Sequence, residues 1–215
     1  MNRHLASALV GVATLAATAF ADDFAPPPYR GGPLSVYARW EFPSEPTNWL
    51  NVTPTAFSAV AGPPAYHLFG LFETHAFGDG GDWQTGPIGG ITPKHGDALI
   101  NFKLQNWVDD LPIKLLRIQV TWSGLKPPDI FSVVGFDPLI IPHLGELVGG
   151  GVVDDHHFYQ DWKIRPNPDW DLITLKVKEG SVLHEVVIDT ISIPAPGAFT
   201  LAGLASLIVA PRRRR

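Results

Sequence analysis

Four consecutive residues in the second half of the chain, Asp154 to His157, carry side chains that could bind a metal ion. Carboxylates and imidazoles are ligands for zinc and other divalent ions. On a strand, however, neighbouring side chains point to opposite faces, so only Asp154 with His156, or Asp155 with His157, would lie together. We therefore prefer a polar loop that follows the glycines at 149–151, and a metal site is the alternative.

A glycine-rich segment from Gly78 to Trp83 could form a calcium loop, because Asp79 and Asp82 supply hard oxygen ligands. Calcium takes about six to eight oxygens, and the spacing and terminal glutamate of an EF-hand are absent. A surface turn explains these residues with fewer assumptions. We expect no cofactor, and structural calcium at Asp79 and Asp82 is the alternative.

Glu73 and His75 could form an acid/base pair, because residues two apart on a strand share a face, about 7 Å apart. No nucleophile motif, phosphate loop or second carboxylate at a suitable spacing accompanies them. We expect a structural role for both residues and predict no catalytic residue.

The seven tryptophans can either pack in a core or stack on sugar rings. Those in alternating segments are expected in the core: Trp40, Trp122 and Trp162. Those beside turns are candidates for exposure: Trp49, Trp83, Trp107 and Trp170. Trp83 and Trp170, with Asp79 and Asp82, are our candidate ligand-binding residues.

The elements that must position these residues are strands. Residues 34–42 alternate between apolar and polar side chains, which is the period of a half-buried strand. Similar patterns, separated by turns rich in glycine and proline, predict strands at 65–77, 98–108, 113–123, 130–136, 146–153, 157–164, 171–178 and 184–193. No long stretch between the two ends keeps a helical period.

This pattern predicts an all-β protein with a single antiparallel β-sandwich of jelly-roll type over residues 34–193. A Greek-key barrel is the alternative. Residues 22–33 are rich in proline and glycine and predict an extended lead-in.

Composition excludes several classes. The 215 residues are 45% hydrophobic and 17% charged, which excludes intrinsic disorder. The absence of cysteine excludes disulfides, thiolate metal sites and a cysteine nucleophile. A formal net charge of −5 argues against nucleic acid as a partner.

The N-terminus predicts a secretory signal peptide over residues 1–21. Arg3 precedes an apolar run from Leu5 to Phe20, and Ala19 and Ala21 form an A-x-A cleavage site. We expect an N-terminal signal helix and export, with a buried N-terminal helix or permanent anchor as the alternative.

The C-terminus combines a helix breaker, a short apolar helix and a basic stop. Pro194 to Gly197 precede an apolar run at 198–210, and Arg212, Arg213, Arg214 and Arg215 end the chain. The run would span about 20 Å as a helix, short of the roughly 30 Å hydrocarbon core. The arginines predict a cytoplasmic end and an exported body.

This tail resembles the C-terminal sorting signal of PEP-CTERM proteins, with Pro194, Ala195, Pro196 and Gly197 at the motif and Ala195 where the family often has glutamate. The resemblance covers residues 194–215 and implies recognition by an exosortase-type membrane protease, with a simple C-terminal anchor as the alternative. The segment from Tyr159 to Ile193 is similar to the last strands of β-sandwich domains common in these proteins.

The resemblance implies an exported cell-surface or extracellular-matrix protein, transiently held in the membrane by its tail. Its partners would be the export machinery, the exosortase-like protease and, as a candidate, surface polysaccharide. Without both ends, 11 basic residues face 21 acidic ones, a net charge near −10. We expect a structural or adhesive protein and not an enzyme. The alternatives are a carbohydrate-binding module and, behind it, a secreted hydrolase.

Overall fold

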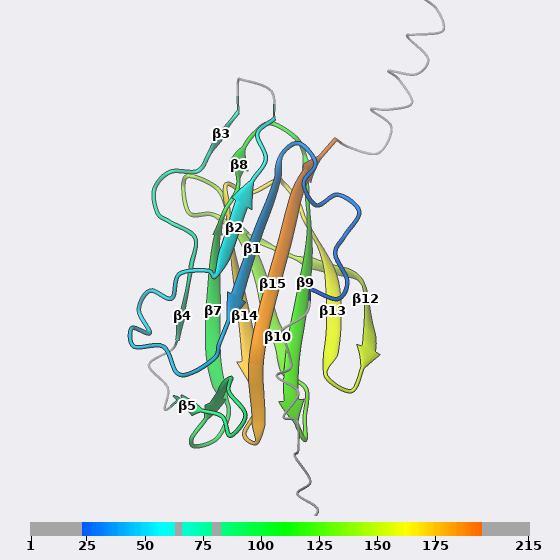
Figure 1. The fold of residues 1–215 in the computed structure, drawn as a ribbon. Coiled ribbons are helices and arrows are strands. Elements are labelled where there is room, and N and C mark those ends of the chain that lie inside the picture. The colour runs from blue at the N-terminus through cyan, green and yellow to red at the C-terminus, as the bar shows by residue number, and fades with distance from the viewer. Residues whose placement is uncertain (1–22, 63–65, 79–82, 195–215) are drawn as a thin grey trace, which may run out of the picture.

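The computed structural model describes residues 23–62, 66–78 and 83–194. Along these residues the chain forms fifteen strands and no helix (Figure 1). A helix able to cross a membrane is therefore not found in this part of the chain. The predicted signal helix, the C-terminal helix and Asp79 and Asp82 lie outside the described residues, as do Ala19, Ala21 and every residue of the tail after Pro194.

Two larger antiparallel sheets organise the chain. Sheet A has the order β12-β13-β9-β15-β1-β2, with β6 beside β15 and β5 beside β6. Its strands are β1 (Ser35–Glu41), β2 (Ala56–Ala59), β5 (Trp83–Thr85), β6 (Ile91–Pro93), β9 (Ile113–Gly124), β12 (Glu146–Asp154), β13 (His157–Ile164) and β15 (Ser181–Ile193).

Sheet B has the order β11-β10-β14-β7-β4. Its strands are β4 (His75–Gly78), β7 (Ala98–Gln105), β10 (Asp129–Phe136), β11 (Pro142–Leu144) and β14 (Trp170–Val177). A small third sheet pairs β3 (His67–Leu68) with β8 (Trp107–Val108). Neither larger sheet closes on itself along the described residues, so the barrel alternative is wrong.

The core contains side chains from both larger sheets. Trp40 and Ile118 of sheet A belong to one buried cluster with Phe102 and Ile173 of sheet B. The rings of Trp40 and Phe102 meet edge to face, with centroids 4.9 Å apart. The alternation predicted for residues 34–42 is confirmed, because Trp40 and its apolar neighbours on that face are all buried. One apolar interior therefore holds both sheets.

One predicted strand is wrong, and one expected turn lies elsewhere. Residues 65–77 do not form one strand, because β3 and β4 are separated by bends and belong to different sheets. The strand predicted at 146–153 is confirmed as β12, so the glycines at 149–151 lie inside it and not at a turn. A Cβ on Gly150 would lie 2.8 Å from the carbonyl oxygen of Tyr159, so glycine permits the close approach of β12 to β13. The turn falls instead at Asp155 and His156.

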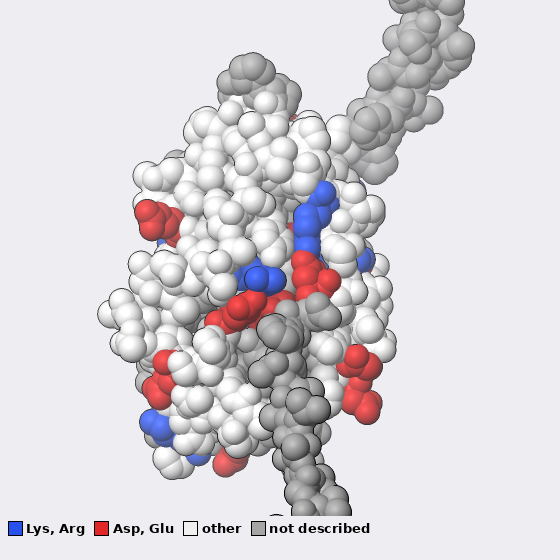
Figure 2. Space-filling view, viewed as in Figure 1, with Lys and Arg blue, Asp and Glu red and all other residues white. Residues whose placement is uncertain are grey.

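The lead-in is held on the outer face of sheet A. The backbone N–H of Ala25 donates to Oε1 of Gln119 at 2.7 Å. Arg30 donates to both carboxylate oxygens of Asp189 at 2.5 Å and also pairs with Asp23. Burial raises the pKa of Asp189, and the Arg30 guanidinium opposes that shift. Figure 2 views this side of the molecule, where basic and acidic side chains lie close together.

Candidate functional site

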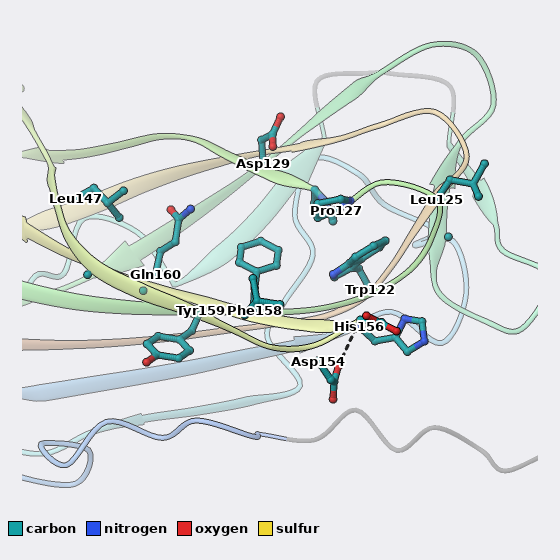
Figure 3. Close-up of a pocket in the computed structure, with 17 residues that line it drawn as sticks. Trp122, Leu125, Pro127, Asp129, Leu147, Asp154, His156, Phe158, Tyr159 and Gln160 are labelled. Carbon is teal, nitrogen blue, oxygen red and sulfur yellow. Dashed lines mark hydrogen bonds between the residues drawn. The ribbon is translucent and has the colours of Figure 1, made fainter.

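A cleft of about 1080 Å³ opens where β12 and β13 extend beside the loop that joins β9 to β10. Its floor is formed by Trp122 and Phe158. Pro127 and Leu125 contribute from the loop, and Leu147 contributes from β12. We call this site the inter-strand cleft (Figure 3).

Strand alternation aims the floor residues into the inter-strand cleft. Phe158 and Gln160 point to one side of β13 and Tyr159 points to the other (Figure 3). On the opposite face, the guanidinium of Arg117 lies over the Tyr159 ring, 4.3 Å from its centroid. Trp122 and Phe158 are each 9% exposed and belong to the main core cluster. The floor is thus the accessible edge of the core.

The loop wall of the cleft is fixed by a glycine. Gly124 has a φ of +108°, and a Cβ there would lie 2.3 Å from the carbonyl oxygen of Gly180. The loop is also tied to the start of β15, because the Ser181 hydroxyl donates to the carbonyl of Lys126. The wall is therefore set by backbone contacts and does not depend on a ligand.

The rim of the cleft is polar and acidic, and its carboxylates are held in place. Asp129 pairs with Nζ of Lys178 at 2.8 Å. Asp154 accepts from the backbone N–H of His156 at 2.8 Å and from the His157 ring at 2.8 Å. These hydrogen bonds hold the pKa of Asp154 below its usual value, the backbone bond first. Asp129 and Gln160 thus lie on the same side as the apolar floor, whereas the Asp154 side chain points to the other side of the strand (Figure 3).

The segment 154–157 is not arranged as a metal centre. Asp154 contacts His157, whereas the His156 ring lies 6.1 Å from the Trp122 ring in an edge contact. In the described part of the chain, no group of three or more His, Cys, Asp or Glu side chains could hold a metal ion. These residues form the turn and the rim of the cleft.

A second group of side chains lies on the outer face of sheet B. The Trp170 ring stacks on Phe136 with centroids 4.2 Å apart, and Phe72 meets it edge-on at 5.4 Å. Nζ of Lys103 lies 3.7 Å from the centroid of Phe72 and 4.7 Å from that of Trp170. A hollow of about 300 Å³ adjoins Trp170 and His75. We call this group the aromatic patch.

His75 lines the hollow beside the aromatic patch, and the other described candidates line neither site. Trp83 is 1% exposed and stacks on Trp49 at 5.1 Å, so its expected exposure is wrong. Trp107 is also buried. Nδ1 of His75 lies 2.7 Å from the backbone carbonyl of Glu73, so the ring contacts that oxygen and not a paired carboxylate.

Sequence reasoning placed Trp122 in the core, which is confirmed, but missed that the same side chain forms the floor of a cleft. The usable signal was the loop after it, where Gly124 and the two prolines at 127–128 interrupt the strand pattern. Pattern alone does not place this loop opposite residues 147–160.

No protein-family model matches the chain, and no curated protein matches it. The cleft and the patch are therefore interpreted from their own chemistry.

Proposed function

We propose that this chain is an exported cell-surface or extracellular-matrix protein. The N-terminal segment 1–21 supports entry into the export machinery. The tail at 194–215 supports recognition by an exosortase-like protease, because a proline-rich motif, an apolar run and four arginines follow in that order. In this proposal the tail holds the body at the membrane only until sorting.

Within that proposal the body is a jelly-roll-like β-sandwich. The order of the strands supports it, because the chain alternates between the two larger sheets. It passes from β9 in sheet A to β10 and β11 in sheet B, then to β12 and β13 in sheet A, to β14 in sheet B and to β15 in sheet A. The single core cluster with members from both sheets also supports it.

The molecular activity we propose is non-enzymatic adhesion to a neutral polysaccharide in the inter-strand cleft. One observation carries the proposal: the aromatic floor of Trp122 and Phe158 lies beneath the polar side chains of Asp129 and Gln160. A sugar ring presents an apolar C–H face for such a floor and hydroxyls for such a rim. A body with a net charge near −10 disfavours anionic polymers. No cofactor is required.

The test is to fill the cleft without disturbing the core. Val152 lines the cleft and is 80% exposed, whereas its neighbour Val153 does not line it and is 52% exposed. Affinity electrophoresis of the full chain in gels containing β-glucan, mannan or xylan should show retardation by at least one polymer. Val152→Trp should weaken that retardation about tenfold, equivalent to about 1.4 kcal/mol, and Val153→Trp should leave it unchanged.

Two results would reject the cleft as the binding site. One is no retardation by any of the three polymers. The other is equal retardation of wild type and Val152→Trp. The aromatic patch is the second candidate site for the same ligand class, because Trp170 remains half-buried beside an open hollow. Retardation that survives Val152→Trp but is lost in Trp170→Ala would assign binding to the patch.

A further inference from the structure

A group of polar side chains lies inside the core, at the end where β9 begins and β15 finishes. Lys114 of β9, Asn106 between β7 and β8, and Asp171 of β14 have no exposed surface. Thr190 and Ser192 of β15 are 0% and 4% exposed. Lys114 and Ser192 are direct partners in the ladder between β9 and β15. A lysine, an asparagine and an aspartate are thus enclosed together away from water.

The contacts in this group activate the asparagine amide. Nδ2 of Asn106 donates to Oδ2 of Asp171 at 2.6 Å. The hydroxyl of Thr190 donates to Oδ1 of Asn106 at 3.2 Å. A nucleophile that attacks the amide carbon needs a hydrogen-bond donor to the carbonyl oxygen and an acid near the nitrogen. Thr190 is placed for the first role and Asp171 for the second.

The lysine amine and this amide have Asp171 as a common neighbour, because Asn106 donates to it and its charge acts on Lys114. Nζ of Lys114 donates to Oγ of Ser192 at 2.9 Å. Thr190 and Ser192 share one face of β15, about 7 Å apart along the strand. These hydroxyls contact Asn106 and Lys114 respectively, so the flexible lysine stem would have to rotate away from Ser192 toward Asn106 before reaction. Reaction requires an approach of about 3 to 3.5 Å.

Burial also shifts the pKa values of Lys114 and Asp171, and both shifts favour the neutral form of the side chain. Desolvation lowers the pKa of Lys114 to about 8, and Asp171 is the first of the carboxylates that oppose this shift. Desolvation raises the pKa of Asp171 to about 6. A neutral amine is a nucleophile, and a carboxyl group with a raised pKa can both accept and return a proton.

We propose that Lys114 and Asn106 form an intramolecular amide cross-link. The neutral amine of Lys114 attacks Cγ of Asn106, and the N–H proton passes to the Asp171 carboxylate. Thr190 donates to the oxyanion of the tetrahedral intermediate. Asp171 then gives the proton to Nδ2, the Cγ–Nδ2 bond breaks, and ammonia leaves. One C–N bond forms and one breaks, so no oxidant or other reactant is needed.

Asn167 is the other asparagine near the amine, and the contacts favour Asn106 over it. Oδ1 of Asn167 lies 3.5 Å from Oγ of Ser192, and its amide donates to Asp109 at 2.8 Å. Both Asn167 and Asp109 are half-buried. Asn106 and Asp171 are wholly enclosed, where water cannot compete for the intermediate.

Peptide mass spectrometry of the full chain tests the cross-link. Trypsin should cut after Lys103, Lys114 and Arg117, and both partners lie between the first and last of these sites. An amide on Nζ blocks cleavage after Lys114. The expected product of the denatured protein is therefore the peptide 104–117, uncut at Lys114 and lighter than its sequence by one ammonia.

Each other product would overturn the assignment. The peptide 104–114 at full mass would mean no bond. The same peptide lighter by one ammonia but cut after Lys114 would mean a succinimide at Asn106. A peptide 104–117 lighter by one water would mean a bond to an aspartate, and a product joined to peptide 164–176 would mean Asn167 or Asp171.

Variants assign the roles of the partners. Asp171→Asn keeps both reacting groups and should yield the unlinked peptides at full mass. Lys103→Arg, on the outer face of sheet B, is the matched control and should keep the cross-link. Retention of the cross-link in Asp171→Asn would remove Asp171 from the reaction. The wild-type peptides decide the existence of the bond even where a variant does not fold.

Discussion

Asp171 carries an ionisable carboxyl group that is buried in the core. It has no exposed surface, and its Oδ1 lies in the core without a hydrogen-bond partner. Burying a carboxylate in this way favours the protonated form, and neither the charge of Lys114 nor the hydrogen bond from Asn106 offsets the loss of hydration. Its protonation state is therefore linked to folding.

We predict that the stability of the protein falls as pH rises through the titration of Asp171. The pKa of Asp171 is raised from 3.8 to about 6 in the folded chain. Between these values the folded state holds a proton that the unfolded state has released, so the free energy of unfolding decreases with rising pH. The decrease should reach about 3 kcal/mol at the upper end.

Urea unfolding from about pH 4 to about pH 7 measures this effect as the difference between wild type and Asp171→Asn. The substitution Asp155→Asn, at an exposed turn residue, is the matched control. A difference between wild type and Asp171→Asn that does not vary with pH would contradict the prediction.

For single residues, the sequence predicted the burial of some tryptophans but not the contacts of the buried polar side chains. Alternation placed Trp40 and Trp122 in the core correctly. Proximity to turns failed for Trp83 and Trp107, because a side chain beside a turn can still fold back under a neighbouring strand. The buried group around Lys114 gave no local signal, since its members come from four separate segments of the chain.

At the scale of elements, β11 and β12 stand out as consecutive strands that end different sheets. β11 is the outermost strand of sheet B and β12 is the outermost strand of the main path of sheet A. No charged residue occurs from Leu147 to Val153. Several apolar side chains on these strands and in the segment just before β11 are about half exposed or more: Leu139, Ile140, Ile141, Leu144, Leu147, Val148, Val152 and Val153. Such an edge can pair with another strand.

We therefore predict concentration-dependent self-association that a charge on β12 reduces. Val153→Lys places a charge on the exposed edge, and sedimentation velocity should show a shift toward monomer by several-fold in concentration. Phe57→Lys is the matched control, because Phe57 is exposed on β2 at the other end of the sheet. A wild type that stays monomeric at every concentration would rule out this role for the edge.

The longer strands could be predicted from sequence and the short ones could not. β13 matches its predicted range, and β9, β10 and β14 differ by one residue at one or both ends, because each alternates over most of its length. β2, β5, β6 and β11 were missed, since three or four residues carry too little alternation to detect. Their pairing depends on the sheet they join.

At the scale of the whole molecule, we expect the two ends to be removed during export and sorting, and the body to remain. Residues 23–62, 66–78 and 83–194 of the body are described, whereas the sorting segments lie outside the described residues. The cleft, the aromatic patch and the buried lysine all belong to the body. Removal of both ends should therefore leave these three features intact.

We predict that protein released at the cell surface lacks Arg212 to Arg215. C-terminal mass spectrometry of the released form checks this, and an intact Arg215 would contradict it. A variant with Pro194→Ala and Pro196→Ala should remain unprocessed and keep its arginines, because the motif that the protease would recognise has been removed. A conservative change in the apolar run, such as Leu204→Ile, is the control and should still be processed.

The position of β15 determines how the protein would respond to mechanical force. β15 lies between β9 and β1, is paired to both over most of its length, and leads directly into the tail (Figure 1). If the tail is held while the cleft grips a polymer, tension enters at Ile193 and runs along the strand axis. The hydrogen bonds that pair β15 with β9 and with β1 then bear the load together in shear, so they would have to break at the same time and not one after another. The attachment point therefore lies at the most strongly paired strand of the sheet.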